Sequence, residues 1–178
     1  RLDMLSAMIF PSTCDVIRNL SGMWKLMKPG VYVRYLDLPQ IRDPEIAGTF
    51  WRRELETLWM ELSELSERAL QQEDLQQSIQ LYNRWRQLIR SLYQIRREKP
   101  WQIPSEELYV LLRAAEVLPP VEFLQMGQDY LQAIEAEPGR PRDKVRVIVC
   151  GSFCEQPPLG LIKTIERAGC YIVDDDFL

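Results

Sequence analysis

Residues 144–177 read KVRVIVCGSFCEQPPLGLIKTIERAGCYIVDDDF, and this stretch decides the fold class. KVRVIV is a short apolar run rich in β-branched residues, which predicts a strand. PLGLIKTIERAG predicts a helix with Pro158 in its first turn and Gly169 at its end. CYIVDDDF predicts a second strand. A strand, a helix and a strand in this order form a βαβ unit with parallel strands and a right-handed crossover.

One such unit does not make a complete sheet. Two parallel strands and one helix leave a face of the sheet open, whereas parallel sheets are normally covered on both faces. We therefore expect the rest of the sheet to come from elsewhere, and we interpret this chain as a fragment of a longer polypeptide.

The beginning of the chain also has α/β character. CDVIRNLSGMWKLM, from Cys14, spaces its apolar residues as a helix does, and KPG ends the helix. VYVRYLDLP then predicts a strand. Residues 1–10 predict no secretion signal, because Asp3 interrupts their apolar stretch.

The middle of the chain is helical throughout. Asp43 and Asp74 are suitable first residues for two long amphipathic helices, and two shorter helices are predicted over 104–118 and 121–136. The fold class is therefore α/β with three parts. Residues 1–42 end a first α/β domain, residues 43–140 form a helical connector, and residues 141–178 begin a second α/β domain.

Composition excludes several function classes. The 178 residues are 46% hydrophobic and 27% charged, as in an ordinary globular protein, and the net charge of −4 argues against a nucleic-acid binder. The chain has no histidine, which removes the commonest general base and metal ligand. No apolar run reaches the ~20 residues of a membrane helix. Four unevenly spaced cysteines do not suit a secreted disulfide scaffold, so we expect a cytoplasmic protein.

The four cysteines are the first candidates for chemistry. Cys14 begins a predicted helix, whose positive end favours a thiolate that binds metal or an iron–sulfur cluster, although its position alone also suits a buried structural cysteine. Cys150 and Cys170 belong to predicted strands and are expected in the core. Cys154 follows the first of these strands, in a loop that either lines a site or fills space.

Three other patterns carry weaker signals. The loop GSFCEQPPLG offers backbone N–H groups that suit an anion, but it matches no phosphate-binding motif. The acidic run at 174–176 predicts a solvated loop that starts a helix, with a cation site as the alternative. The arginine-rich stretch 84–97 predicts a solvated helix face.

Two motifs in this order resemble a known family. CDVIRNLSGMWKL with YVRYLDLPQ is similar to the cysteine motif of the benzoyl-CoA reductase and 2-hydroxyacyl-CoA dehydratase family. RVIVCGSFCEQPPLGLIKTIERAGCYIVDDDF resembles the start of that family's second α/β domain, and its CEQPP variant is similar to the class I, ATP-dependent benzoyl-CoA reductases. LQQSIQLYNRWRQLIRSLY between them resembles the family's helical connector.

The resemblance implies a fold and an activity. It implies two Rossmann-like parallel-sheet domains joined by helices, a paired homologous subunit and a [4Fe-4S] cluster near a bound acyl-CoA. An ATPase activator with its own iron–sulfur cluster, supplied by ferredoxin, would deliver electrons of low potential. The substrate would be benzoyl-CoA, reduced to a cyclic dienoyl-CoA during anaerobic degradation of aromatic compounds.

The resemblance also implies roles for single residues. Cys14 matches the family's cluster cysteine, and the other cluster ligands fall outside these residues. Gly151, Ser152, Cys154 and Gln156 belong to a loop that would approach the cluster or the acyl-CoA. Two alternatives remain: a 2-hydroxyacyl-CoA dehydratase subunit that works by a radical, and a non-catalytic helical module that pairs subunits, in which Cys14 is a core residue.

Overall fold

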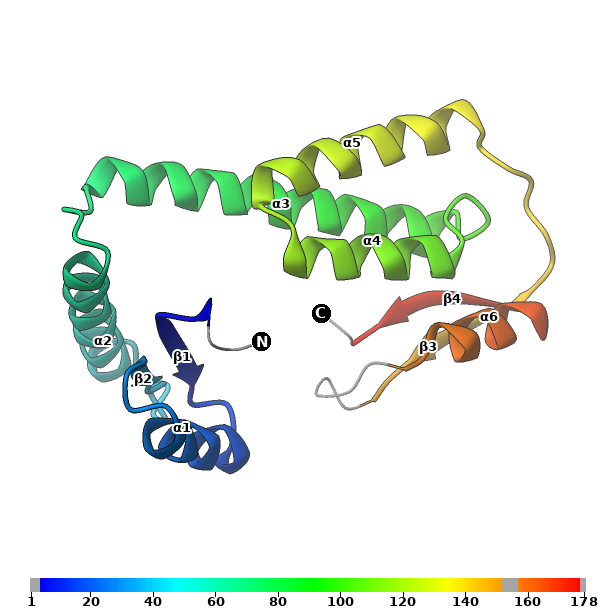
Figure 1. The fold of residues 1–178 in the computed structure, drawn as a ribbon. Helices are drawn as coiled ribbons and strands as arrows, with labels where there is room; N and C mark the ends of the chain where they lie inside the picture. The colour runs from blue at the N-terminus through cyan, green and yellow to red at the C-terminus, as the bar shows by residue number, and fades with distance from the viewer. Residues whose placement is uncertain (1–3, 152–156, 177–178) are drawn as a thin grey trace. The chain divides into compact units, whose positions relative to one another are not determined.

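The computed structural model of the protein describes residues 4–151 and 157–176. The chain divides into two compact units, Arg1–Gln71 and Gln72–Leu178 (Figure 1). Both units contain helices and a pair of parallel strands, so the chain is a mixed α/β protein as the sequence predicts. The division into three domains stays a prediction.

The first unit is built around a parallel strand pair. Strand β1 (Ala7–Pro11) leads through helix α1 (Asp15–Met27) to strand β2 (Tyr32–Leu36), and Ala7 pairs with Tyr32. The sequence predicts the helix and the second strand, but β1 was not foreseen. Within this unit Phe10 is buried, and its ring lies 6.1 Å from the ring of Trp24 on α1.

Helix α2 (Pro44–Leu65) completes the first unit and begins where the sequence predicts. The Asp43 carboxylate accepts hydrogen bonds from the Glu45 and Ile46 N–H groups, as an N-cap residue does. Polar contacts join α2 to the sheet, because Arg34 of β2 binds Glu54 at 2.9 Å and Glu61 at 2.8 Å.

Three helices form the core of the second unit. They are α3 (Gln72–Glu98), α4 (Ser105–Val117) and α5 (Pro120–Ala136), which lie side by side in Figure 1. Helix α3 begins two residues before Asp74, which therefore is not its N-cap. The helices bury a cluster of side chains that comprises Leu88, Leu92, Ile103, Leu108, Leu111, Leu112, Ala115, Phe123 and Ile134.

The described residues of the quoted stretch form the strand pair and last helix of the second unit. Strand β3 (Val145–Val149), helix α6 (Leu159–Arg167) and strand β4 (Cys170–Asp175) follow the predicted order, and β3 pairs with β4 in parallel. Gly169 has φ +94°, a conformation that favours glycine and that ends α6 where the sequence predicts. Strand β4 contacts both α3 and α6, so the sheet is attached to the helical core.

A glycine permits the close packing of α5 on α3. A Cβ added at Gly127 would clash with Cδ2 of the buried Leu88 side chain, so that side chain would have to shift. We expect Gly127→Ala to lower the free energy of unfolding by roughly 1–3 kcal/mol, the usual cost of overpacking. Gly160→Ala in α6 is the matched control, because its Cβ would meet nothing within 4 Å. Denaturant titration of both variants checks this, and equal stabilities would contradict it.

Candidate functional site

Cys14 lies at the start of α1 and is exposed. It is the N-cap residue, with extended backbone at φ −160°, and its C=O accepts from the Arg18 N–H at 3.2 Å. Its side chain makes no capping hydrogen bond. The thiol is therefore not a core group of the first unit, and it lies at the positive end of the α1 dipole.

The turn before Cys14 is attached to the end of β2. The Ser12 N–H donates to the Leu36 C=O at 2.9 Å, and the Ser12 Oγ accepts from the Leu38 N–H at 2.7 Å. These bonds hold the chain at the carboxyl ends of both parallel strands. This edge is where α/β proteins bind their ligands.

Gly151 occupies the matching edge of the second unit, directly after Cys150 and the end of β3. Its N–H donates to Asp176 Oδ1 at 2.9 Å. In this arrangement the N–H is not available to a phosphate, and the neighbouring carboxylate repels anions. The other three predicted loop residues, Ser152, Cys154 and Gln156, lie outside the described residues. Cys14 and Gly151 belong to different units.

A cluster of charged groups joins β4 to the end of α3. Asp175 accepts from Arg96 Nη2 and from Tyr93 Oη, both at 2.7 Å, and the side chains of Arg96 and Asp175 are only 3% and 5% exposed. Next to this pair, Arg97 binds Asp174 at 2.8 Å in a more exposed position. Burial and, to a smaller extent, the hydrogen bond to Asp175 raise the pKa of Tyr93.

This cluster corrects two predictions. The acidic run was predicted to be solvated at the end of the strand CYIVDDDF. The strand is confirmed as far as Asp175, but the side chain of Asp175 is buried in an ion pair with Arg96. The arginine-rich face was predicted to be solvated, but Arg96 is 2% exposed. Sequence reasoning missed this pairing, although the adjacent arginines of α3 and the adjacent aspartates of β4 are complementary in charge.

The remaining cysteines are also placed. Cys150 was predicted to point into the core, but it is exposed at the end of β3. Cys170 is only half-buried at the start of β4, although it was expected in the core.

Over residues 4–151 and 157–176, no group of three or more Cys, Asp or Glu side chains could hold a metal ion. Among these residues Cys14 could therefore offer a cluster one exposed thiol, and its described neighbours could not complete the coordination.

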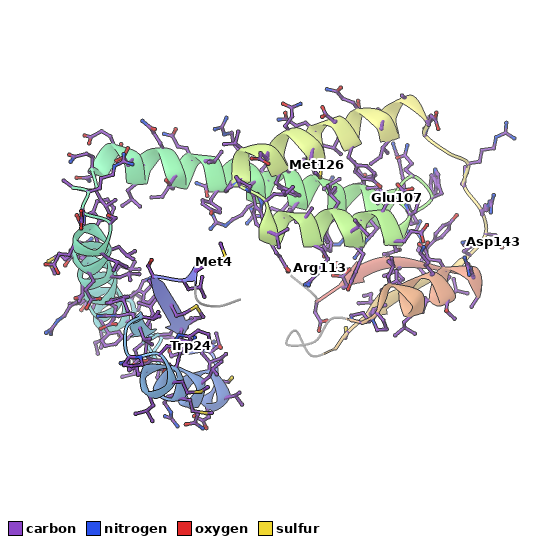
Figure 2. All side chains as sticks on the ribbon, in the orientation of Figure 1. Met4, Trp24, Glu107, Arg113, Met126 and Asp143 are labelled. Carbon is purple, nitrogen blue, oxygen red and sulfur yellow. The ribbon has the colours of Figure 1, made fainter. Side chains whose placement is uncertain are left out.

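The second unit also has a groove between α4, α5 and α6. It has a volume of about 590 Å³, and Val110, Leu111, Ala114 and Met126 give it a mainly apolar lining. Glu107 and Met126, which Figure 2 labels, come from α4 and α5. Charged contacts border the groove: Lys163 binds Glu106 at 2.9 Å, and Tyr130 Oη donates to Glu107. Burial, with the bond to Glu107, raises the pKa of Tyr130.

Among the residues that the structure describes, no helix has the length and apolar character needed to cross a membrane.

Known proteins resemble this chain along its whole length. Residues 1–178 match the family described as 2-hydroxyglutaryl-CoA dehydratase, D-component. One of the subunits of benzoyl-CoA reductase from Thauera aromatica is 51% identical over 178 residues, which are all of this chain and 46% of that protein.

Two dehydratase subunits are more distant. Lactoyl-CoA dehydratase subunit beta of Anaerotignum propionicum is 28% identical over 98% of this chain and 45% of its own length. The (R)-2-hydroxyglutaryl-CoA dehydratase subunit beta of Acidaminococcus fermentans is 26% identical over 98% of this chain and 46% of its own length. The chain thus spans about half the length of these relatives, and it belongs to the benzoyl-CoA reductase and 2-hydroxyacyl-CoA dehydratase family.

Proposed function

We propose that this chain is part of a subunit of an ATP-dependent benzoyl-CoA reductase. The complete enzyme would pass electrons to the aromatic ring of benzoyl-CoA and yield a cyclic dienoyl-CoA, a step in anaerobic degradation of aromatic compounds. One observation carries the proposal: identity is 51% to a benzoyl-CoA reductase subunit but only 28% and 26% to the two dehydratase subunits.

The proposal includes the fold of the complete protein. Each unit would be part of a Rossmann-like domain, joined through the helical connector. In support, each unit contains two parallel strands joined by a helix, and both candidate loops follow the first strand of such a pair.

Cys14 would supply one thiolate ligand to a [4Fe-4S] cluster. Its exposure and its position at the N-terminus of α1 support this role. When bound, such a cluster supplies single electrons of low potential, which no side chain provides. The other ligands would come from outside the described residues. Gly151, Ser152, Cys154 and Gln156 would line the cluster or the acyl-CoA.

The complete enzyme would have several partners. They are a homologous paired subunit, an ATPase activator that carries iron–sulfur, and ferredoxin as the electron donor, all in the cytoplasm. The names of the three relatives support the pairing, because each is named as a subunit.

A 2-hydroxyacyl-CoA dehydratase subunit is the second candidate. The family match and the 28% identity to a lactoyl-CoA dehydratase subunit favour it. In that enzyme an electron would act catalytically and water would be lost, so the product would contain no added electrons.

Counting electrons per product separates the two candidates. The full-length protein, produced with its partner subunits and purified without oxygen, is given ATP, a low-potential reductant and either benzoyl-CoA or lactoyl-CoA. We expect loss of benzoyl-CoA with electrons consumed in proportion to the dienoyl-CoA formed. Water loss from lactoyl-CoA with only catalytic electrons would make the protein a dehydratase. A colourless preparation that is inactive on both substrates would favour the remaining interpretation, a non-catalytic helical module that pairs subunits.

A further inference from the structure

Three consecutive aspartates at the end of β4 make three different attachments. Asp174 and Asp175 bind the arginines at the end of α3, at 2.8 and 2.7 Å. Asp176 turns instead to the neighbouring strand and accepts the Gly151 N–H at 2.9 Å. The end of β4 therefore connects helix α3 to the point where the chain leaves β3.

An irregularity in the strand pairing makes these directions possible. Val147 pairs with Ile172, but the next residue, Ile148, pairs with Asp174, so β4 contains one extra residue. Side chains of a regular strand alternate between the two faces. A bulge interrupts this alternation and changes where the following side chains point. Asp174 and Asp175 thereby both reach α3.

Further bonds fix the end of α3 against the sheet. Arg146 of β3 donates to the Arg97 C=O at 2.8 Å, so both strands are bonded to the end of this helix. The guanidinium of Arg96 also lies 4.6 Å from the centre of the Tyr93 ring. The end of β4, which carries Asp176, is thus held in place by buried and paired side chains.

We propose that Asp176 is a positioning residue that fixes the start of the loop after β3. Its carboxylate holds the Gly151 N–H, and the buried ion pair of Asp175 with Arg96 holds the end of β4 that carries it. Any role of this loop in contacting an acyl-CoA rests on the proposed function, but the positioning does not.

Hydrogen exchange tests the positioning directly. In the full-length protein within its complex, the Gly151 amide is followed by mass spectrometry of peptides that end on either side of it. We expect Asp176→Ala to speed this exchange by roughly two- to ten-fold, the factor for a hydrogen bond of ordinary strength. The intrinsic exchange rate stays the same, because the substitution leaves the sequence neighbours of Gly151 unchanged.

Two further variants make the test specific. Asp176→Asn keeps an oxygen that accepts the N–H and should keep exchange within about two-fold of wild type. Asp174→Ala removes the contacts to Arg97 and to the Asp175 N–H but keeps the Asp176 carboxylate, so it should also leave Gly151 protected. Unchanged exchange in Asp176→Ala would overturn the proposal, as would an equal increase in Asp174→Ala.

Kinetics then separate this proposal from the proposed function. In a complex that reduces benzoyl-CoA, we expect Asp176→Ala to raise the KM for benzoyl-CoA more than it lowers kcat, with rescue by Asp176→Asn. Faster exchange at Gly151 with an unchanged KM would support the positioning role and count against the loop as part of the acyl-CoA site.

Discussion

Cys14→Ser is expected to remove the iron of one cluster from the full-length complex. The serine oxygen is a poor substitute for the thiolate that iron–sulfur clusters require. The substitution should leave the fold intact, because Cys14 is exposed and its side chain makes no capping hydrogen bond. Activity should fall by roughly 100-fold or more, since residues that only orient a metal ligand already cost about 10–100-fold when removed.

Iron content and low-temperature EPR of the anoxically purified complex measure this effect. Cys170→Ser is the control, because it removes a thiol from the start of β4, at the edge of the strand pair opposite to the one that Gly151 follows. The control should keep its iron and its signal. If Cys14→Ser keeps both while the subunits assemble normally, Cys14 is not a ligand, and the family membership describes the fold without this chemistry.

Arg96→Met is expected to destabilise the second unit strongly. It removes the ion pair that Arg96 makes with the Asp175 carboxylate, whose side chain is 5% exposed. Removing one partner of a buried ion pair costs about 3–5 kcal/mol, because the remaining buried charge loses its counter-ion. Urea unfolding of the full-length protein, followed by tryptophan fluorescence, measures the loss.

Two variants show that burial is the cause. Arg97→Met breaks the exposed pair with Asp174 and should cost less than about 1 kcal/mol. The double variant Arg96→Met with Asp175→Leu removes both charges and should recover part of the loss, since apolar groups of similar volume can replace a buried pair. If Arg96→Met costs no more than Arg97→Met, the pair does not stabilise the unit.

Local sequence signals predicted most of the fold. Asp43 caps α2 because its side chain reaches N–H groups two and three residues ahead. The βαβ unit at 145–175 followed from short apolar runs around an amphipathic helix. Strand β1 was missed, because AMIFP shows no alternation and gains its strand character by pairing with β2.

Local sequence patterns could not predict contacts between residues that are far apart in the chain. Arg96 and Asp175 are separated by 79 positions, so no spacing rule joins them. Cys150 was assigned to the core from its place beside Val149 and Ile148 in the predicted strand, but among the described residues β3 pairs with β4 alone, and Val145 and Ile148 are exposed. Cys14 was found through its motif, and its exposure could not be read from the sequence.

The two βαβ units also set an order of events during synthesis. Ala7 pairs with Tyr32 and Val145 pairs with Cys170, so the first paired residues of each βαβ unit are separated by the same short length of chain. Closing a short stretch loses little entropy, and such contacts form quickly. The first unit's strands can therefore pair while the ribosome is still making α3. Arg96, in contrast, cannot pair with Asp175 until β4 has been made. Until then, its charge keeps the end of α3 hydrated.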